Sequence, residues 1–192
     1  MIKAIIFDNA GVIMTEAYWL WLHKNIPNLE KRRDFFHDIS YKVDSSSISP
    51  DQFLNYLAKE SGKEAKQVKK EILSTFVLNK EVYKLMKKLK RNYKIGLLSN
   101  FISEWLKILL KKFNIKEVFD AMIVSTEHKM IKPDPKMYQL IAEMLGVKPQ
   151  EAVFIDDRES NITGAVNVGM KGILFNNPQD LKEKLKKLGI TI

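Results

Sequence analysis

Five short apolar runs, separated by longer amphipathic stretches, limit the fold of this chain more than any other feature. The runs are Ala4–Phe7, Ile95–Leu98, Ala121–Val124, Ala152–Ile155 and Gly172–Phe175. Apolar residues at helical spacing mark the stretches between and after them, which are Lys80–Arg91, Ser103–Lys112, Pro135–Leu145, Asn161–Val168 and Pro178–Leu188. Strands that alternate with helices of this length form βαβ units. The sequence therefore predicts an α/β fold with a Rossmann-like parallel sheet flanked by helices.

One long segment interrupts this alternation. Residues 15–79 contain no strand pattern but show helical periodicity and many aromatic side chains. Ser49 followed by Pro50 is typical of a helix start inside this segment. The segment is too long for a simple crossover, so we expect a small all-helical cap subdomain at 15–79. The α/β core would then comprise residues 1–14 and 80–192.

Composition and charge narrow the function classes. The chain has 192 residues, no cysteine and no apolar stretch of membrane-spanning length, and its start, MIKAIIFDN, does not resemble a signal peptide. We therefore expect a cytoplasmic protein without a membrane partner. The net charge is +9, but the lysines alternate with leucines at helical spacing in VYKLMKKLKRN (82–92) and DLKEKLKKLG (180–189). This pattern is typical of a solvated helix face, so no nucleic-acid partner is expected.

Polar side chains follow the first four predicted strands directly or in the next loop. They are, in chain order, Asp8, Ser99, Asn100, Lys132, Asp156 and Asp157. Parallel strands bring their carboxyl ends to one edge of a sheet, where open α/β sheets bind ligands. Clustered carboxylates repel one another unless a cation lies between them, which indicates a hard divalent metal such as Mg²⁺. A lysine and a hydroxyl beside the metal would suit a phosphate group, and Asp8 could attack its phosphorus.

Four motifs in this order resemble the haloacid dehalogenase superfamily of hydrolases. They are FDNAGV (7–12), LLSN (97–100), Lys132 within KPDP, and FIDDRESN (154–161). The helical insertion also falls where that family carries a helical cap. By this resemblance Asp8 is the nucleophile and a metal ligand, and Ala10 offers its backbone carbonyl to the metal. Asp157 would contact Mg²⁺ most closely, with Asp156 a ligand directly or through water.

The resemblance also implies a phosphate-binding set. Ser99 would hold the phosphoryl group, Asn100 would shape that turn beside the phosphate, and Lys132 would bridge the nucleophile and the phosphate. The expected function is a Mg²⁺-dependent phosphatase that acts on a small phosphorylated metabolite through an aspartyl-phosphate intermediate. The substrate and the oligomeric state are left open.

One departure from the family pattern affects the chemistry. Phosphatases of this family carry a second aspartate two residues after the nucleophile as general acid and base, and this chain has Ala10 there. General acid–base catalysis is typically worth about 10²–10⁴-fold in rate. Ordinary monoester hydrolysis should therefore be weakened unless another group substitutes, and Glu16, His23 and His37 are the candidates in or near the cap.

Three alternatives remain open at this stage. A metal-independent 2-haloacid dehalogenase would also lack that second aspartate, although the pair Asp156 and Asp157 argues against a metal-free site. A phosphonoacetaldehyde hydrolase-like enzyme would need a cap lysine to form an imine, for which Lys42 and Lys59 are available. A non-catalytic binding descendant would explain Ala10 but not the retained acidic residues.

Overall fold

The predicted parallel sheet is present. The computed structural model describes residues 1–192, and its five strands lie in the order β3-β2-β1-β4-β5 with every neighbouring pair parallel. The strands are β1 (Ala4–Phe7), β2 (Lys94–Ser99), β3 (Ala121–Val124), β4 (Ala152–Asp156) and β5 (Lys171–Leu174). β1 is central, and its residues are fully buried, as expected for a strand covered on both faces.

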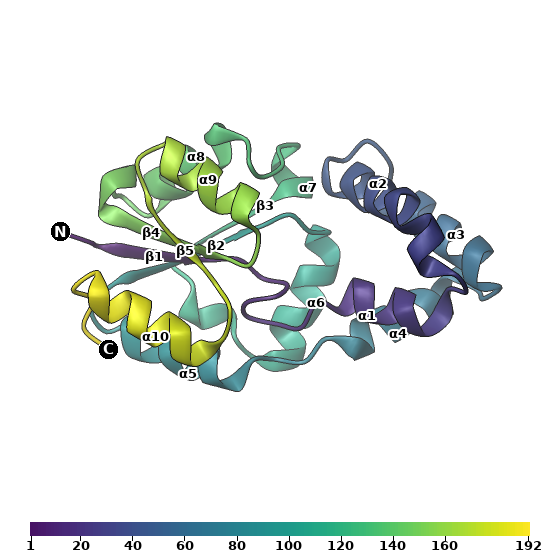
Figure 1. The fold of residues 1–192 in the computed structure, drawn as a ribbon, viewed down its shortest axis with the longest axis horizontal. Coiled ribbons are helices and arrows are strands. Elements are labelled where there is room, and N and C mark those ends of the chain that lie inside the picture. Colours follow the sequence, from purple (N-terminus) through teal and green to yellow (C-terminus); the bar gives the residue numbers. More distant parts are fainter.

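Helices cover both faces of the sheet. They are α5 (Lys80–Leu89), α6 (Ser103–Phe113), the short α7 (Ser125–His128), α8 (Pro135–Met144), α9 (Glu159–Asn167) and α10 (Pro178–Lys187). In Figure 1, α8 and α9 lie on one side of the sheet, and α5 and α10 lie on the other. Alternating β1 side chains serve the two faces, because Ile5 and Phe7 join the apolar cluster of α5 and α10 while Ile6 joins that of α8.

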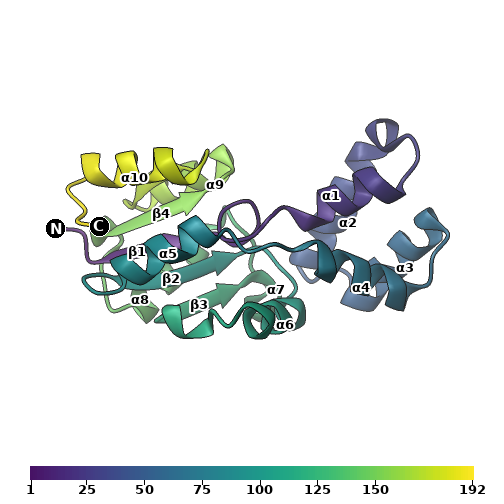
Figure 2. The same cartoon turned by 90° about the horizontal axis from the view of Figure 1, so that it is seen from below.

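The segment at residues 15–79 forms helices and no strand of the sheet, as predicted. It forms α1 (Ala17–Asn25), α2 (Arg33–Asp44), α3 (Pro50–Ser61) and α4 (Ala65–Thr75), with a 3₁₀ turn at Leu29–Arg32. Two further 3₁₀ turns lie at Lys116–Val118 and Pro149–Glu151. Figure 2 shows the four helices as a separate group beyond one end of the sheet, opposite to the N- and C-termini.

The helix α3 begins where the sequence predicts, and the two tryptophans of α1 lie in different surroundings. Ser49 caps α3 in a capping box with Gln52, and Pro50 is the first helical residue. Trp21 is buried in the core, whereas Trp19 is half-buried and lies in the wall of a pocket. The two indoles therefore face different environments, because residues two apart point to different faces of a helix.

The two chain segments that join the helical group to the sheet are paired. The Thr15 amide donates to the Val77 carbonyl over 3.0 Å, and the Asn79 amide donates to the Ile13 carbonyl over 2.9 Å. The Thr15 hydroxyl adds two bonds, because it donates to the Thr75 carbonyl and accepts from the Val77 amide. The segments 13–15 and 75–79 thus form a short ribbon, which we call the connecting ribbon.

The predicted elements differ from the observed ones at their ends, and the short helix α7 is not among the predicted ones. α9 begins at Glu159 rather than Asn161, and just before it the Arg158 amide donates to Oδ1 of Asp156. No helix in the fold combines the length and apolar character that crossing a membrane requires.

Candidate active site

The strand order brings the predicted site residues to one edge of the sheet. β1 lies between β2 and β4, and Phe7 is paired with Leu97 on one side and Ile155 on the other. Asp8 follows Phe7, and its amide still donates to the Ile155 carbonyl over 2.9 Å. The ends of the three central strands therefore place Asp8 next to Asp156.

Lys132 joins these two aspartates although it lies on a different loop. Its Nζ atom donates to Oδ1 of Asp8 over 2.6 Å and to Oδ2 of Asp156 over 2.7 Å. The Asn100 side chain fixes the lysine backbone, since its Oδ1 accepts the Lys132 amide and its Nδ2 donates to the Lys132 carbonyl. Because both polar atoms of Asn100 are used in this way, Asn100 positions Lys132 in the structure.

Asp156 is fully buried and has hydrogen-bond partners on both carboxylate oxygens. Oδ1 accepts from the Arg158 amide, Oδ2 accepts from Lys132, and the Asn161 side chain donates to both over 3.0 Å. These bonds satisfy a charge that would otherwise be costly to bury. Asp156 therefore holds Lys132 in place whether or not it also contacts a cation.

Three carboxylates converge at this edge. One oxygen from each of Asp8, Asp156 and Asp157 lies within 4.8 Å of the other two, and Asp157 is the least buried of the three. Gly11 permits this approach, because its φ of +90° is unfavourable for other residues and a Cβ there would overlap the Asp157 carboxylate. The donor set of three oxygens matches the preference of Mg²⁺.

Burial and repulsion between the carboxylates raise the pKa values of Asp8 and Asp157. Burial raises the pKa of Asp8 to about 7, the Lys132 ammonium opposes this rise, and the charges of Asp156 and Asp157 add to it. Burial alone would lower the pKa of Lys132, but the charges of Asp8 and Asp156 raise it, so the lysine stays protonated. The pKa of Asp157 is also raised, by burial first and by Asp156 second. A divalent cation would relieve this excess of negative charge.

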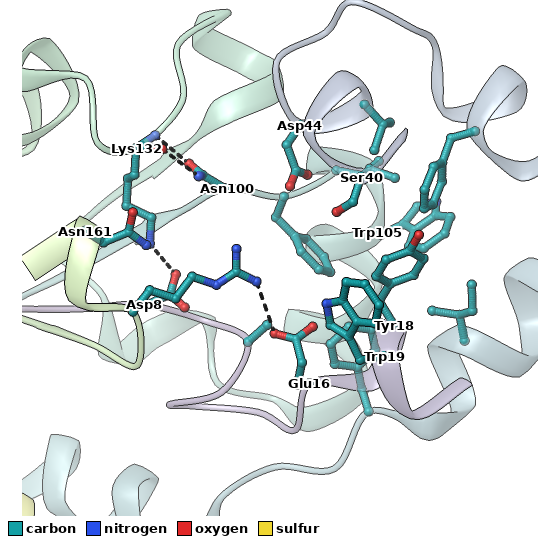
Figure 3. A pocket seen from close by; sticks show the side chains of 18 residues that line it. Asp8, Glu16, Tyr18, Trp19, Ser40, Asp44, Asn100, Trp105, Lys132 and Asn161 are labelled. Atoms are coloured by element: carbon teal, nitrogen blue, oxygen red, sulfur yellow. Dashed lines mark hydrogen bonds and ion pairs between the residues drawn. The ribbon is translucent and has the colours of Figure 1, made fainter. Parts of the chain in front are cut away.

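A pocket opens from Asp8 toward the helical group. It encloses about 710 Å³, its mouth included, and Asp8, Asn100 and Lys132 line one end of it (Figure 3). Ala10 also lines the pocket. The other walls are rich in aromatic side chains from the helical group and from the loops and helix after β2. These are Tyr18, Trp19, Phe53, Phe76, Phe101 and Trp105. Ser99 is buried at the end of β2 and, like Asp156 and Asp157, does not line this pocket.

Only one of the three candidate replacement acids is in the pocket wall. Glu16 lines the pocket and lies 3.9 Å from Arg158, and burial raises its pKa. His23 and His37 are exposed and do not line the pocket, and His37 packs against Trp19 instead.

Two charged wall residues, Asp44 and Arg158, do not figure in the sequence prediction. Asp44 ends α2 and reaches the pocket only because that end of the helix faces the sheet edge. Arg158 directly follows the acidic pair in FIDDRESN, so this motif could have marked it as a residue of the site. Asp44 stands in a serine-rich stretch that looks like an ordinary loop, and no local pattern marks it.

Similarity to known proteins identifies the family of this chain. The sequence model of the haloacid dehalogenase-like hydrolases matches residues 2–169, so the chain belongs to this hydrolase family. Among curated relatives, the pyrophosphatase PpaX of Bacillus cereus is 26% identical over 185 residues, which cover 88% of this chain and 81% of the relative. Flavin mononucleotide hydrolase 1 of Arabidopsis thaliana is 34% identical over 88 residues, 46% of this chain and 36% of that protein.

Solved structures show the same fold. A haloacid dehalogenase family enzyme of Bacteroides thetaiotaomicron, solved in complex with magnesium and inorganic phosphate, superimposes with a TM-score of 0.75 and 26% identity. The superposition covers 92% of this chain and 95% of that enzyme. The L-2-haloacid dehalogenase of Xanthobacter autotrophicus superimposes with a TM-score of 0.69 at 21% identity over 100% of this chain and 85% of that one, which shows the shared fold alone.

Proposed function

We propose that this hydrolase is a Mg²⁺-dependent phosphatase that transfers the phosphoryl group of a small substrate to Asp8. The observation that carries the proposal is the arrangement around Lys132, whose ammonium contacts Asp8 and Asp156 while the Asp157 carboxylate lies within 4.8 Å of both aspartates. A nucleophile, a fixed cation and a set of oxygen donors for a metal at one point are what phosphoryl transfer requires.

The chain's own residues would divide the reaction between them. A carboxylate oxygen of Asp8 attacks phosphorus, and the bond from phosphorus to the ester oxygen breaks with its electron pair on the leaving group. Water then cleaves the aspartyl-phosphate, which releases inorganic phosphate and restores Asp8. Lys132 would balance negative charge on the phosphoryl oxygens. Ser99 and Asn100, at the end of β2, would bind the same phosphoryl group.

The metal site would be built from Asp8, Asp157 and the Ala10 carbonyl, with Asp156 directly or through water. When bound there, Mg²⁺ would supply a fixed positive charge that orients the phosphoryl group and stabilises charge in the transition state. The pKa values of Asp8 and Asp157 are raised by burial first and by neighbouring carboxylates second, and they support this assignment because a bound cation would favour the charged forms.

The helical group would act as a cap over this reaction. We propose residues 15–79 as the cap subdomain and residues 1–14 and 80–192 as the core, with the aromatic side of the pocket selecting the leaving group. The magnesium and phosphate complex of the Bacteroides relative supports a phosphate substrate, and the names of the two curated relatives extend the candidates to pyrophosphate and flavin mononucleotide.

Two alternatives from the sequence find less support. The acidic trio argues against a metal-free dehalogenase, since Asp157 adds repulsion beside the two carboxylates that already share Lys132. An imine mechanism needs a lysine in the pocket, but Lys42 is exposed and paired with Asp38, and Lys59 is also exposed. Neither of these lysines lines the pocket.

The direct test is hydrolysis of para-nitrophenyl phosphate with Mg²⁺ and with a chelator. We expect turnover only with the metal, and loss of turnover in Asp8→Asn, which removes the nucleophile and nearly keeps its shape. Circular dichroism would check that the variant is folded. Metal binding without turnover on a broad phosphate panel would instead favour a non-catalytic protein.

A further inference from the structure

The pocket has two ends with different chemistry. The end formed by Asp8, Asn100 and Lys132 suits a phosphoryl group, and the remaining walls are mostly apolar and aromatic. If the proposed function holds, the phosphate occupies the first end, so the leaving group must lie between the aromatic walls. Ring faces of this kind favour flat, apolar groups.

Asp44 is the unpaired charge in these walls. It lies at the end of α2, and Figure 3 shows it on the cap side of the pocket, across from Asp8. It has no hydrogen-bonded partner, and the nearest cationic groups, Arg158 and Lys132, act on it only through their fields. Burial is the main cause that raises the pKa of Asp44 to about 7, with Glu16 and Asp8 adding to the rise. A positive or hydrogen-bond-donating group in the pocket would relieve this cost.

The other charges near the leaving group do not compensate Asp44. Lys132 is already shared between Asp8 and Asp156, and Arg158 faces Glu16 at 3.9 Å. The cap itself contributes no lysine or arginine to the pocket wall. A leaving group with its own negative charge would therefore meet uncompensated carboxylate.

A second polar group in the wall is also without a partner. Trp105 is 3% exposed, and its buried indole N–H makes no hydrogen bond. An unmet donor in an otherwise apolar wall costs free energy unless a ligand or water accepts from it. Because this N–H is itself buried, Trp105 lines the pocket mainly as an aromatic wall, and Asp44 is the polar group left to meet a ligand.

From these observations we infer that the substrate is a phosphate ester of a flat, apolar alcohol or phenol. This alcohol or phenol carries an ammonium or similar donor group, and that group binds the Asp44 carboxylate. The inference rests on the proposed phosphatase function and adds to it the class of leaving group. It disfavours substrates with an anionic leaving group, and among the candidates named above it therefore disfavours pyrophosphate.

Three aryl phosphates that differ only at the para position test this inference. They carry an aminomethyl, a hydroxymethyl or a carboxylate substituent, so the ring and the ester oxygen stay the same while the charge changes. We expect kcat/KM with Mg²⁺ to be about ten-fold to a hundred-fold higher for the ammonium ester than for the hydroxymethyl ester, the range expected for one hydrogen bond to a charged group. The carboxylate ester should be the slowest.

Asp44→Asn should reduce the ammonium preference, which is the ratio of kcat/KM for the aminomethyl ester to that for the hydroxymethyl ester, to less than about three-fold. Asp38→Asn is the matched control, because Asp38 lies on the same helix but is exposed and paired only with Lys42. That variant should keep the wild-type order. Equal rates for the three esters in the wild type would overturn the inference and leave the phosphatase function standing. A uniform loss for all three esters in Asp44→Asn would also overturn it, because Asp44 would then act on the reaction itself.

If folded protein with Mg²⁺ hydrolyses none of the esters, the proposed function fails. A binding measurement then tests whether Asp44 binds an ammonium group in the pocket. Calorimetry would then compare the aminomethyl and hydroxymethyl forms of benzylphosphonate. Tighter binding of the ammonium form that is lost in Asp44→Asn would support the inference. Equal binding of the two forms would contradict it.

Discussion

At the scale of single residues, Ala10 sets the chemistry that this site can perform. Ala10 lines the pocket, and by the resemblance stated above it stands where phosphatases of this family carry their general acid. The chain has the proposed nucleophile Asp8 and Lys132 but no acid at that position. Substrates whose leaving groups depart without a proton should therefore react best.

Ala10→Asp should restore the missing acid. We expect a rise in kcat of up to about 10²–10⁴-fold for alkyl phosphates and a much smaller rise for para-nitrophenyl phosphate, whose leaving group needs no proton. Ala10→Asn is the control, because it has nearly the same shape but carries no acidic proton. An equal gain in both variants would show that the effect is one of shape rather than of proton transfer.

Gly11 controls the position of Asp157. Gly11→Ala would place a Cβ where the Asp157 carboxylate lies, so we expect Mg²⁺ affinity measured by calorimetry to fall at least about ten-fold. Gly62→Ala is the matched control, since Gly62 also has positive φ but a Cβ there meets nothing within 4 Å. Unchanged Mg²⁺ affinity in the first variant would argue that Asp157 is not a ligand.

At the scale of elements, the connecting ribbon holds the cap helices to the sheet. It forms between segments that are sixty or more residues apart in sequence, and the Thr15 hydroxyl bonds across it. Ala10 and Glu16, which lie on either side of Thr15 in the sequence, both line the pocket.

Thr15→Val removes both hydroxyl bonds and keeps the shape of the side chain. We expect the free energy of unfolding, measured in urea, to fall by about 1–2 kcal/mol, which is typical for two such bonds. Thr163→Val is the comparison, because that exposed hydroxyl bonds only within its own helix. A loss in Thr15→Val no larger than in this comparison would mean that the hydroxyl bonds contribute nothing to the ribbon.

At the scale of the whole molecule, the sequence predicted the sheet and the shared edge because both follow from local patterns. The strand ends at Asp8 and Asp156 could be placed from apolar runs alone, and parallel pairing then brought them together. The position of Asp44 could not be predicted, because it depends on how the end of α2 lies against the sheet edge. Nor could the two bonds from Asn100 to the Lys132 backbone, which join loops 32 residues apart.

The acidic site should make stability depend on pH and magnesium together. The pKa of Asp8 is raised from 3.8 to about 7, so without metal its contribution to stability is present below pH 4 and is lost as pH rises toward 7. Mg²⁺ competes with this proton. The rise in melting temperature that Mg²⁺ causes should therefore be larger at pH 8 than at pH 5.5, relative to chelator at each pH. A rise of the same size at both pH values would speak against an ion beside Asp8.

Acid quench during turnover of para-nitrophenyl phosphate, followed by mass spectrometry of the peptide that contains Asp8, tests the central claim most directly. We predict a phosphoryl group on Asp8 in the presence of Mg²⁺ and none with chelator or in Asp8→Asn. Turnover with no phosphoryl group on Asp8, or with the group on another residue, would contradict it.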